Sequence, residues 1–225
     1  MFIASSHSAH SRLCPRRPST TVLSATCSRS QSLNSLNTRA ISINTTTLGA
    51  SQLLAIIIPH RPDSFTRYGQ RLGPVQGVGY INELLARLTG KPVRDNTQTN
   101  RTLDASPATF PLDRTIYADF SHDNQMIAIY AAMGLFRQQT PPDPSQPDPK
   151  RNWLASHLVP FSAQMITERL RCGRKEYVRV FVSDALQPLE FCNPEGNGLC
   201  ALDDFVESQA YARNDGAGDF EACFS

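Results

Sequence analysis

The first 62 residues of this 225-residue chain contain no Asp and no Glu. We call residues 1–62 the leader; it is rich in Ser and Thr and carries six arginines, at positions 12, 16, 17, 29, 39 and 61. The whole chain has 22 basic and 20 acidic residues, so removing the leader's six leaves 16 basic and 20 acidic residues, a formal charge of about −4. The net charge of +2 therefore comes from the leader, and residues 63–225 form a separate, acidic part.

Long apolar runs are also missing. The run from Leu53 to Ile58 is much shorter than the roughly 20 residues that a membrane-spanning helix needs. It also lies far from the N-terminus, where the apolar core of a secretory signal peptide belongs. We therefore expect no membrane association, and the chain shows no clear signal peptide.

Several motifs of common enzyme and binding sites are absent. The cysteines and histidines lack the short, paired spacing of a zinc site. Ser121 is not part of a Gly-x-Ser-x-Gly nucleophile elbow, and Gly73, Gly77 and Gly79 do not have the spacing of a phosphate loop, so close packing explains them better. The basic leader lacks interleaved aromatic residues. We expect no metal, no cofactor and no nucleic-acid partner.

Periodicity beyond the leader predicts an α/β protein. Helices are expected over 74–88, 125–136 and 202–212, a strand over 115–120, and a β-hairpin from 164–172 and 177–182. Pro74 suits the first turn of the first helix, and Gly90 ends it. Residues 91–114 are expected to form an extended loop, residues 140–149 a Pro-rich linker, and residues 220–225 a tail.

The segment from Tyr117 to Asn124 combines these patterns with reactive side chains. His122 and Asp123 follow the predicted strand and precede the predicted helix, which is the edge where open α/β sheets bind ligands. A helix N-terminus offers N–H groups to an anion, and a carboxylic acid can protonate a leaving oxygen. The alternative is that Ser121 or Asp123 merely caps the helix and His122 is a surface residue. His157, near Trp153, is better explained as a structural or solvated residue.

Four stretches resemble the C-terminal half of fungal phytases of the histidine acid phosphatase family: residues 72–95, 100–124, 159–172 and 177–192. The resemblance runs from Tyr68 to Ser225. It implies a partial histidine-phosphatase fold, similar to phosphoglycerate mutase, that lacks its N-terminal half. It also implies that Asp123 is the general acid, that His122 holds the phosphoryl group, and that Asn124 completes the His-Asp-Asn signature. The implied substrates are inositol phosphates or other phosphomonoesters.

The family's nucleophilic histidine lies in an Arg-His-Gly-x-Arg-x-Pro motif, which this sequence does not contain. The nearest string, Pro59-His60-Arg61-Pro62, lacks both the glycine and the second arginine. Phosphoryl transfer by a histidine needs that nucleophile and several guanidinium groups around the phosphate. We therefore expect little or no turnover from the chain by itself, with a missing N-terminal half as the natural partner. The alternative is a non-catalytic remnant that binds phosphate or a partner.

The resemblance further implies a local disulfide between Cys192 and Cys200. It places the partners of Cys172 and Cys223 in the missing half, so these two are expected to be unpaired, unless Cys14 or Cys27 substitutes. Asn44 and Asn100 begin glycosylation triplets, and Asn100 falls within the family-like region. Family members are secreted, and disulfides and glycosylation agree with an oxidising compartment.

The leader has three interpretations. Its composition is typical of an organellar transit peptide, of a disordered extension, or of translated non-coding sequence from a wrongly assigned gene start. We favour the last, because the resemblance begins abruptly where the leader ends. Without the N-terminal half, the strand at 115–120 is expected to lose its neighbours and expose an edge.

Overall fold

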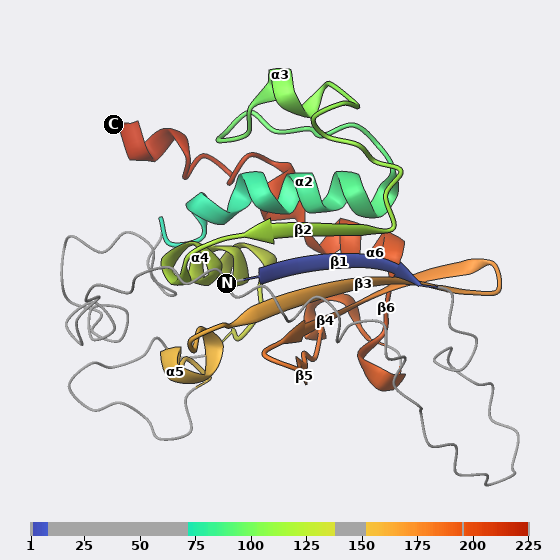
Figure 1. The fold of residues 1–225 in the computed structure, drawn as a ribbon. Coiled ribbons are helices and arrows are strands. Elements are labelled where there is room, and N and C mark those ends of the chain that lie inside the picture. The colour runs from blue at the N-terminus through green and yellow to red at the C-terminus, as the bar shows by residue number, and fades with distance from the viewer. Residues whose placement is uncertain (1, 9–71, 138–151, 195, 225) are drawn as a thin grey trace, which may run out of the picture.

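A computed structural model describes residues 2–8, 72–137, 152–194 and 196–224. It confirms the α/β class, with one mixed sheet and helices packed against it (Figure 1). The strands are β1 (Phe2–Ser8), β2 (Ile116–Phe120), β3 (Gln164–Cys172), β4 (Lys175–Val182), β5 (Ala185–Leu186) and β6 (Cys200–Ala201). The α-helices are α2 (Val78–Thr89), α3 (Arg101–Asp104), α4 (Asp123–Met133), α5 (Ala155–Leu158), α6 (Leu202–Ser208) and α7 (Ala210–Arg213).

The sheet has the order β2-β1-β3-β4-β5, and β6 also pairs with β4. Strands β3 and β4 form the predicted antiparallel hairpin, in which Met165 faces Val182 and Cys172 faces Lys175. Strand β1 runs parallel to β3 and antiparallel to β2. Because Phe2 pairs with both Phe120 and Gln164, the last residue of β2 and the first residue of β3 lie at the same end of the sheet's strands.

Strand β1 corrects two expectations about the leader. Residues 2–8 form a strand rather than a disordered segment, and the rest of the leader lies outside the described residues. This strand supplies a sheet neighbour for β2, which was expected to have none. Residues 2–8 (FIASSHS) show no strict alternation of apolar and polar residues, so the sequence pattern gave little indication of a strand there.

Helix α2 closely matches its prediction. The residues preceding it form the short 3-10 helix η2 (Val75–Gly77), and Gly90 ends α2 with φ +69°, a left-handed conformation that glycine adopts without strain. A Cβ atom on Gly77 would lie 2.4 Å from the carbonyl oxygen of Ala128 in α4. Close helix packing therefore requires this glycine, as the sequence suggested.

Helix α4 begins two residues earlier and ends three residues earlier than predicted. Gly134, with φ +87°, ends the helix, so Leu135 and Phe136 lie in the following turn. Apolar residues lie on all faces of α4, so the spacing of apolar residues in the sequence could not show where the helix ends. Its buried side chains join α2 and the hairpin in one core, whose largest members include Tyr130, Phe205, Ile81, Leu84, Met126 and Met165.

The C-terminal helix is broken where one continuous helix was predicted. Gln209, with φ −85° and ψ 30°, separates α6 from α7. Its buried side-chain amide donates to the carbonyl oxygen of Met133 at 3.3 Å, at the end of α4. Two other expectations are corrected: the loop 91–114 contains α3, and the tail contains the 3-10 helix η5 (Glu221–Phe224). The predicted linker at 140–149 lies outside the described residues.

The cysteines give one confirmation and one correction. Cys192 and Cys200 form the expected disulfide, with their Cα atoms 6.0 Å apart. Cys172, expected to be unpaired, is disulfide-bonded. The expectation for Cys172 had left open a substitute partner in Cys14 or Cys27. Cys14, Cys27 and the side chain of Cys223 lie outside the described part of the chain.

Candidate active site

The predicted site residues lie together where β2 ends and α4 begins. His122 has extended backbone, with φ −116° and ψ 163°, and Asp123 is the first residue of α4. His122 and Asn124 are exposed, and Asp123 is half-buried. The strand-to-helix junction expected from the sequence is therefore present, and its three polar side chains are accessible to a ligand.

Backbone N–H groups in the first turn of α4 orient two of these side chains. The Asp123 carboxylate accepts a hydrogen bond from the N–H of Asn124, and the Asn124 side-chain oxygen accepts one from the N–H of Gln125, both at 2.8 Å. His122 occupies the N-cap position, and its side chain makes no capping bond. The interpretation of Ser121 or Asp123 as the N-cap is therefore wrong. The positive end of the helix dipole faces this group and favours an anion there.

Strand β2 presents two different faces. Tyr117 and Asp119 point toward helix α2, and Tyr117 is buried. On the other face Ile116 is 53% exposed and Phe120 is 83% exposed, which is unusual for large apolar residues at a sheet edge. Phe120 lies at the end of β2 next to the His-Asp-Asn segment, and Ile116 lies at the other end of the strand.

Arg87 of α2 binds the inward face of β2. Its guanidinium contacts both carboxylate oxygens of Asp119, at 2.5 and 3.3 Å, and it lies 4.9 Å from the ring centre of Phe110 and 5.1 Å from that of Tyr117. Glu83, one turn earlier on α2, is 3.8 Å away. We call these five residues the Arg87 cluster.

Burial and charge in this cluster shift the pKa values of its members. Burial raises the pKa of Glu83 to about 7; Arg87 opposes that shift, and Asp104 and Asp119 add to it. Burial lowers the pKa of Arg87, but its hydrogen bond to Asp119 and the charges of Asp119, Tyr80 and Glu83 together outweigh that effect, so the net shift is upward. Burial, and then the charge of Asp119, raise the pKa of the neighbouring Tyr80. The cluster is therefore a buried cation shared by two carboxylates, one of which is protonated in mildly acidic solution.

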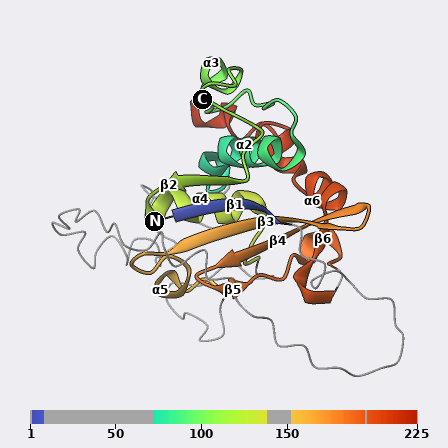
Figure 2. The ribbon, with the colours of Figure 1, turned by 45° about the vertical axis from the view of Figure 1, so that its right-hand side comes forward.

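The sequence analysis missed the Arg87 cluster. Arg87 follows Glu83 at the i, i+4 spacing of a helical ion pair, which was the available signal. Its burial could not be predicted, because it depends on the loop around Phe110 folding over α2. Helix α3 and its flanking loop lie beyond α2 on the side away from the strands (Figure 2).

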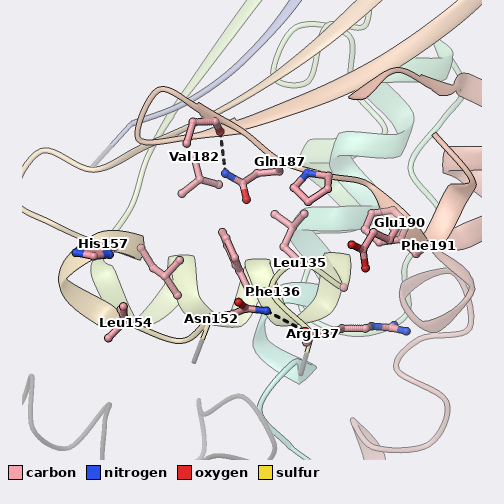
Figure 3. A pocket seen from close by; sticks show the side chains of 14 residues that line it. Leu135, Phe136, Arg137, Asn152, Leu154, His157, Val182, Gln187, Glu190 and Phe191 are labelled. Carbon is pink, nitrogen blue, oxygen red and sulfur yellow. Dashed lines mark hydrogen bonds between the residues drawn. The ribbon is translucent and has the colours of Figure 1, made fainter. Parts of the chain in front are cut away.

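A cavity of about 660 Å³ lies at the opposite end of α4 from the predicted site. Its walls include Leu135, Phe136 and Phe191, and its rim includes Arg137, His157 and Glu190 (Figure 3). His122, Asp123 and Asn124 do not line it. His157 is exposed and lines this cavity, and its expected structural or solvated role stays a prediction.

The described ranges contain neither a metal cluster nor a membrane span. No group of three or more His, Cys, Asp or Glu side chains in those ranges could hold a metal ion. Nor does any helix of the described part have the length and apolar character needed to cross a bilayer. The cofactor and nucleic-acid expectations stay predictions.

Asn100 has a structural role in addition to its predicted glycosylation. Its side-chain oxygen caps α3 by accepting from the N–H groups of Thr102 and Leu103, at 3.1 and 3.3 Å. The residue is exposed, so a glycan on its amide nitrogen stays a prediction that the geometry permits. Asn44 lies outside the described residues, as do His60 and its neighbours.

Comparisons with known proteins match most of the chain. The family model described as "Histidine phosphatase superfamily (branch 2)" matches residues 31–183, which begins upstream of Tyr68. Phytase A of Emericella nidulans is 48% identical over 161 residues, covering 70% of this chain and 34% of that protein. Phytase A of Arthroderma benhamiae is 45% identical over 159 residues, covering 67% of this chain and 35% of that protein.

A solved structure gives a similar result for the fold. The crystal structure of the phytase from D. castellii superposes with a TM-score of 0.51 at 21% identity, over 65% of this chain and 28% of that one. At that identity the likeness shows the fold alone. The chain thus spans about a third of the length of the curated relatives it matches.

Proposed function

Because this chain belongs to the histidine phosphatase superfamily, branch 2, we propose that it carries the acid-donating part of a phosphomonoesterase active site. The observation that carries the proposal is the accessible His122-Asp123-Asn124 segment at the N-terminus of α4. The relatives are named phytases, which supports inositol hexakisphosphate and related phosphomonoesters as the substrates. Secretion and glycosylation at Asn100 belong to the same proposal.

Each residue has a role in this reaction. His122 holds the phosphoryl oxygens, and the positive end of the α4 dipole favours their negative charge. As the bond between phosphorus and the leaving oxygen breaks, the carboxylic acid of Asp123 transfers its proton to that oxygen and becomes a carboxylate. A general acid of this kind contributes roughly 10²- to 10⁴-fold to a rate.

The nucleophile must come from elsewhere. The sequence contains no Arg-His-Gly-x-Arg-x-Pro motif, so we propose that the chain alone does not turn over substrate. An N-terminal half would supply the nucleophilic histidine and the guanidinium groups. The exposed Phe120, two residues before His122, supports this end of β2 as part of the surface that the N-terminal half would cover.

Isothermal titration of the full chain with inositol hexakisphosphate tests the binding role. Saturable heat that weakens about tenfold in His122→Gln, and not in His157→Gln, supports it. The matched control is informative because both histidines are exposed and lie at opposite ends of α4. No saturable heat from the unmodified chain would refute phosphate binding.

A rate measurement on the reconstituted protein tests catalysis. Asp123→Asn should lower phosphate release by at least about 10²-fold when the missing half is supplied. An unchanged rate would exclude Asp123 as the general acid. The second candidate function is that of a non-catalytic phosphate-binding protein, which the absence of the nucleophile motif favours. This function predicts that the chain binds phosphate without turnover, even when an N-terminal half is added.

A further inference from the structure

We propose that Arg87 is a positioning residue for His122, acting through Asp119 of strand β2. The inference rests on the proposed function, because it assigns a residue that fixes one part of the same site. Arg87 does not belong to the His-Asp-Asn segment and acts only through the strand that leads to it. Its role follows from how differently the two sides of that segment are held.

The α4 side of the segment is held by helix packing. The crossing of α4 with η2 at Gly77 is close, and the side-chain amide of Gln125 donates to the carbonyl oxygen of Gln76 at 2.7 Å. Met126 is fully buried just beyond the segment. Asp123 is the first residue of this helix, so α4 fixes its position.

On the β2 side, all five residues of the strand pair with β1, and inward side chains join the strand to α2. The strand has five residues and lies at the end of the strand order within the described sheet, where β1 is its neighbour. Its two inward side chains, Tyr117 and Asp119, both contact Arg87. The Arg87 guanidinium therefore links both inward side chains of β2 to helix α2.

His122 has the extended backbone of a strand, and its carbonyl oxygen accepts from the N–H of Met126 at 3.0 Å, so this residue joins β2 to α4. Its imidazole makes no capping hydrogen bond to α4, and the ring is exposed. The backbone that leaves β2, three residues after Asp119, sets the direction of the Cα–Cβ bond of His122. Loosening Arg87 from Asp119 should therefore change the surroundings of the His122 ring more than those of Asp123.

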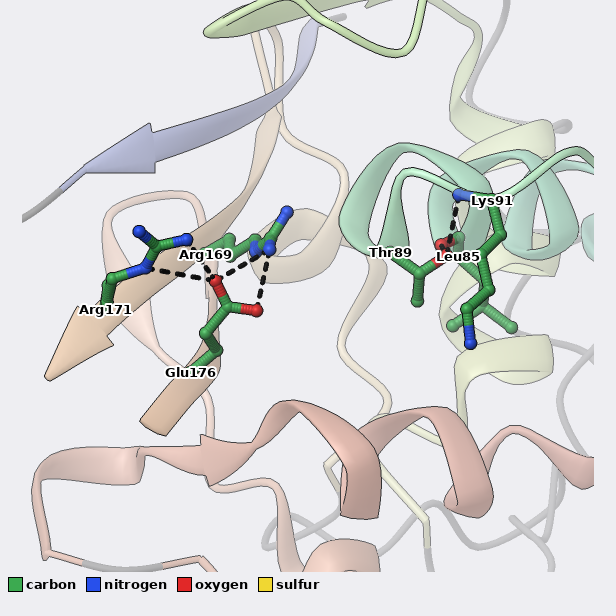
Figure 4. A network of polar contacts seen from close by, with 6 residues as sticks. All are labelled: Leu85, Thr89, Lys91, Arg169, Arg171 and Glu176. Carbon is green, nitrogen blue, oxygen red and sulfur yellow. Dashed lines mark hydrogen bonds and ion pairs between the residues drawn. The ribbon is translucent and has the colours of Figure 1, made fainter. Parts of the chain in front are cut away.

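The geometry of the bridge makes a conservative substitution informative. Arginine can contact two carboxylate oxygens with a planar fork, whereas lysine keeps the charge and loses the fork. Arg87→Lys should therefore keep the fold and disturb the strand. Arg169 gives a control without the fork, since its Nη2 alone contacts both carboxylate oxygens of Glu176, at 2.6 and 2.7 Å, on the β3–β4 hairpin (Figure 4).

The test is an NMR comparison of the full chain. The chain has five histidines, so ring signals are few, and His122→Gln identifies the one of interest. Arg87→Lys should shift the His122 ring signals and weaken saturation by inorganic phosphate by roughly three- to tenfold. The signals of His157 should not move, and the carboxyl signal of Asp123 should shift less than those of His122. Arg169→Lys should leave all of them unchanged.

Asp119→Asn provides an independent variant. It should shift the same His122 signals, and the double variant Arg87→Lys/Asp119→Asn should shift them no further, because both changes break one bridge. Folded single variants with wild-type His122 signals would overturn the proposal. If Arg87→Lys and Asp119→Asn both fail to fold while Arg169→Lys folds, the proposal would also be overturned, in favour of a purely structural role for the bridge.

The ring signals and the phosphate titration separate this proposal from the proposed function. If the unmodified chain fails to bind phosphate, the proposed binding role of His122 fails. The comparison of ring signals without phosphate still decides whether Arg87 positions His122.

Discussion

Two arginine–carboxylate bridges in this protein have the same chemistry in different surroundings. Arg87 and Asp119 join α2 to β2, and the arginine side chain is 10% exposed between two aromatic rings. Arg169 and Glu176 join neighbouring strands of a hairpin, where Arg171 also reaches the carboxylate. The first bridge connects elements that are not adjacent in the chain, whereas the second reinforces a hairpin already held by backbone pairing. A bridge between separate elements, with a desolvated charge, should matter more to the fold.

The largest difference should appear when each arginine is replaced by methionine. Arg87→Met leaves the Asp119 carboxylate without its cation and close to Glu83, so we expect a loss of about 2–4 kcal/mol in the free energy of unfolding. Urea unfolding followed by circular dichroism measures it. A loss no larger than that of Arg169→Met would contradict the comparison.

The next effect concerns pH. The folded-state pKa of Glu83 is raised to about 7, above its ordinary value of 4.5, so the folded protein holds this proton more tightly than the unfolded chain. Its contribution to stability is fully present below about pH 4.5 and is lost as pH rises to about 7. The contribution should be on the order of 1 kcal/mol, since the side chain is partly exposed.

Glu83→Gln should remove that dependence. Denaturant midpoints measured from about pH 4 to pH 8 should fall over this window in the unmodified chain and should be flatter in the variant. The Glu176 carboxylate has the opposite shift: burial raises its pKa, but its bonds to Arg169 and Arg171 lower it overall. A Glu176→Gln variant that flattened the same window would show that Glu83 is not the group responsible.

Removing one aromatic ring should have a smaller effect. Phe110→Leu keeps the apolar volume but removes a ring that lies over the Arg87 guanidinium, and a cation–π contact of this kind is worth about 0.5–2 kcal/mol. Thermal unfolding measures the change. Phe181→Leu, beneath Arg179 at the same 4.9 Å, is the matched control on the hairpin.

The smallest effect is expected on the hairpin itself. Arg169→Met should lower the free energy of unfolding by no more than about 1 kcal/mol, since Arg171 still contacts Glu176 and the surroundings are partly solvated. The loss should shrink further in high salt, where exposed ion pairs are screened. A loss that persists unchanged at about 1 M salt would mean that this bridge is as well shielded as the Arg87 bridge.

Local patterns were enough to predict much of this fold. Gly90 and the apolar face of α2, the strand at 116–120 and the β3–β4 hairpin are all encoded by nearby residues, and the structure confirms them. The position of His122 and Asp123 at a strand-to-helix junction followed from the same patterns. Elements whose shape depends on distant partners were not predictable, such as the break at Gln209, where a side chain turns inward to bond with Met133.

The same reason explains what was missed at the candidate site. Arg87 looks like an ordinary exposed helix residue in sequence, and only the fold brings Phe110, Tyr117 and Asp119 around it. The resemblance to a family supplied the roles of His122, Asp123 and Asn124, which no local pattern could distinguish from a helix start. Strand β1 was hidden inside a leader that composition describes as unstructured.

Strand β1 has a consequence for the order of folding. Its residues pair with a strand that begins at Gln164, so the pairing joins two ends of the chain that are synthesised far apart in time. The entropic cost of closing such a loop rises by about 0.6 kcal/mol for each doubling of its length, and contacts this distant in sequence slow folding. The hairpin of β3 and β4 can form from neighbouring residues, whereas the pairing of β1 with β3 must first close this long loop. Strand β2, and His122 with it, should therefore reach its final position in one of the last and slowest kinetic steps.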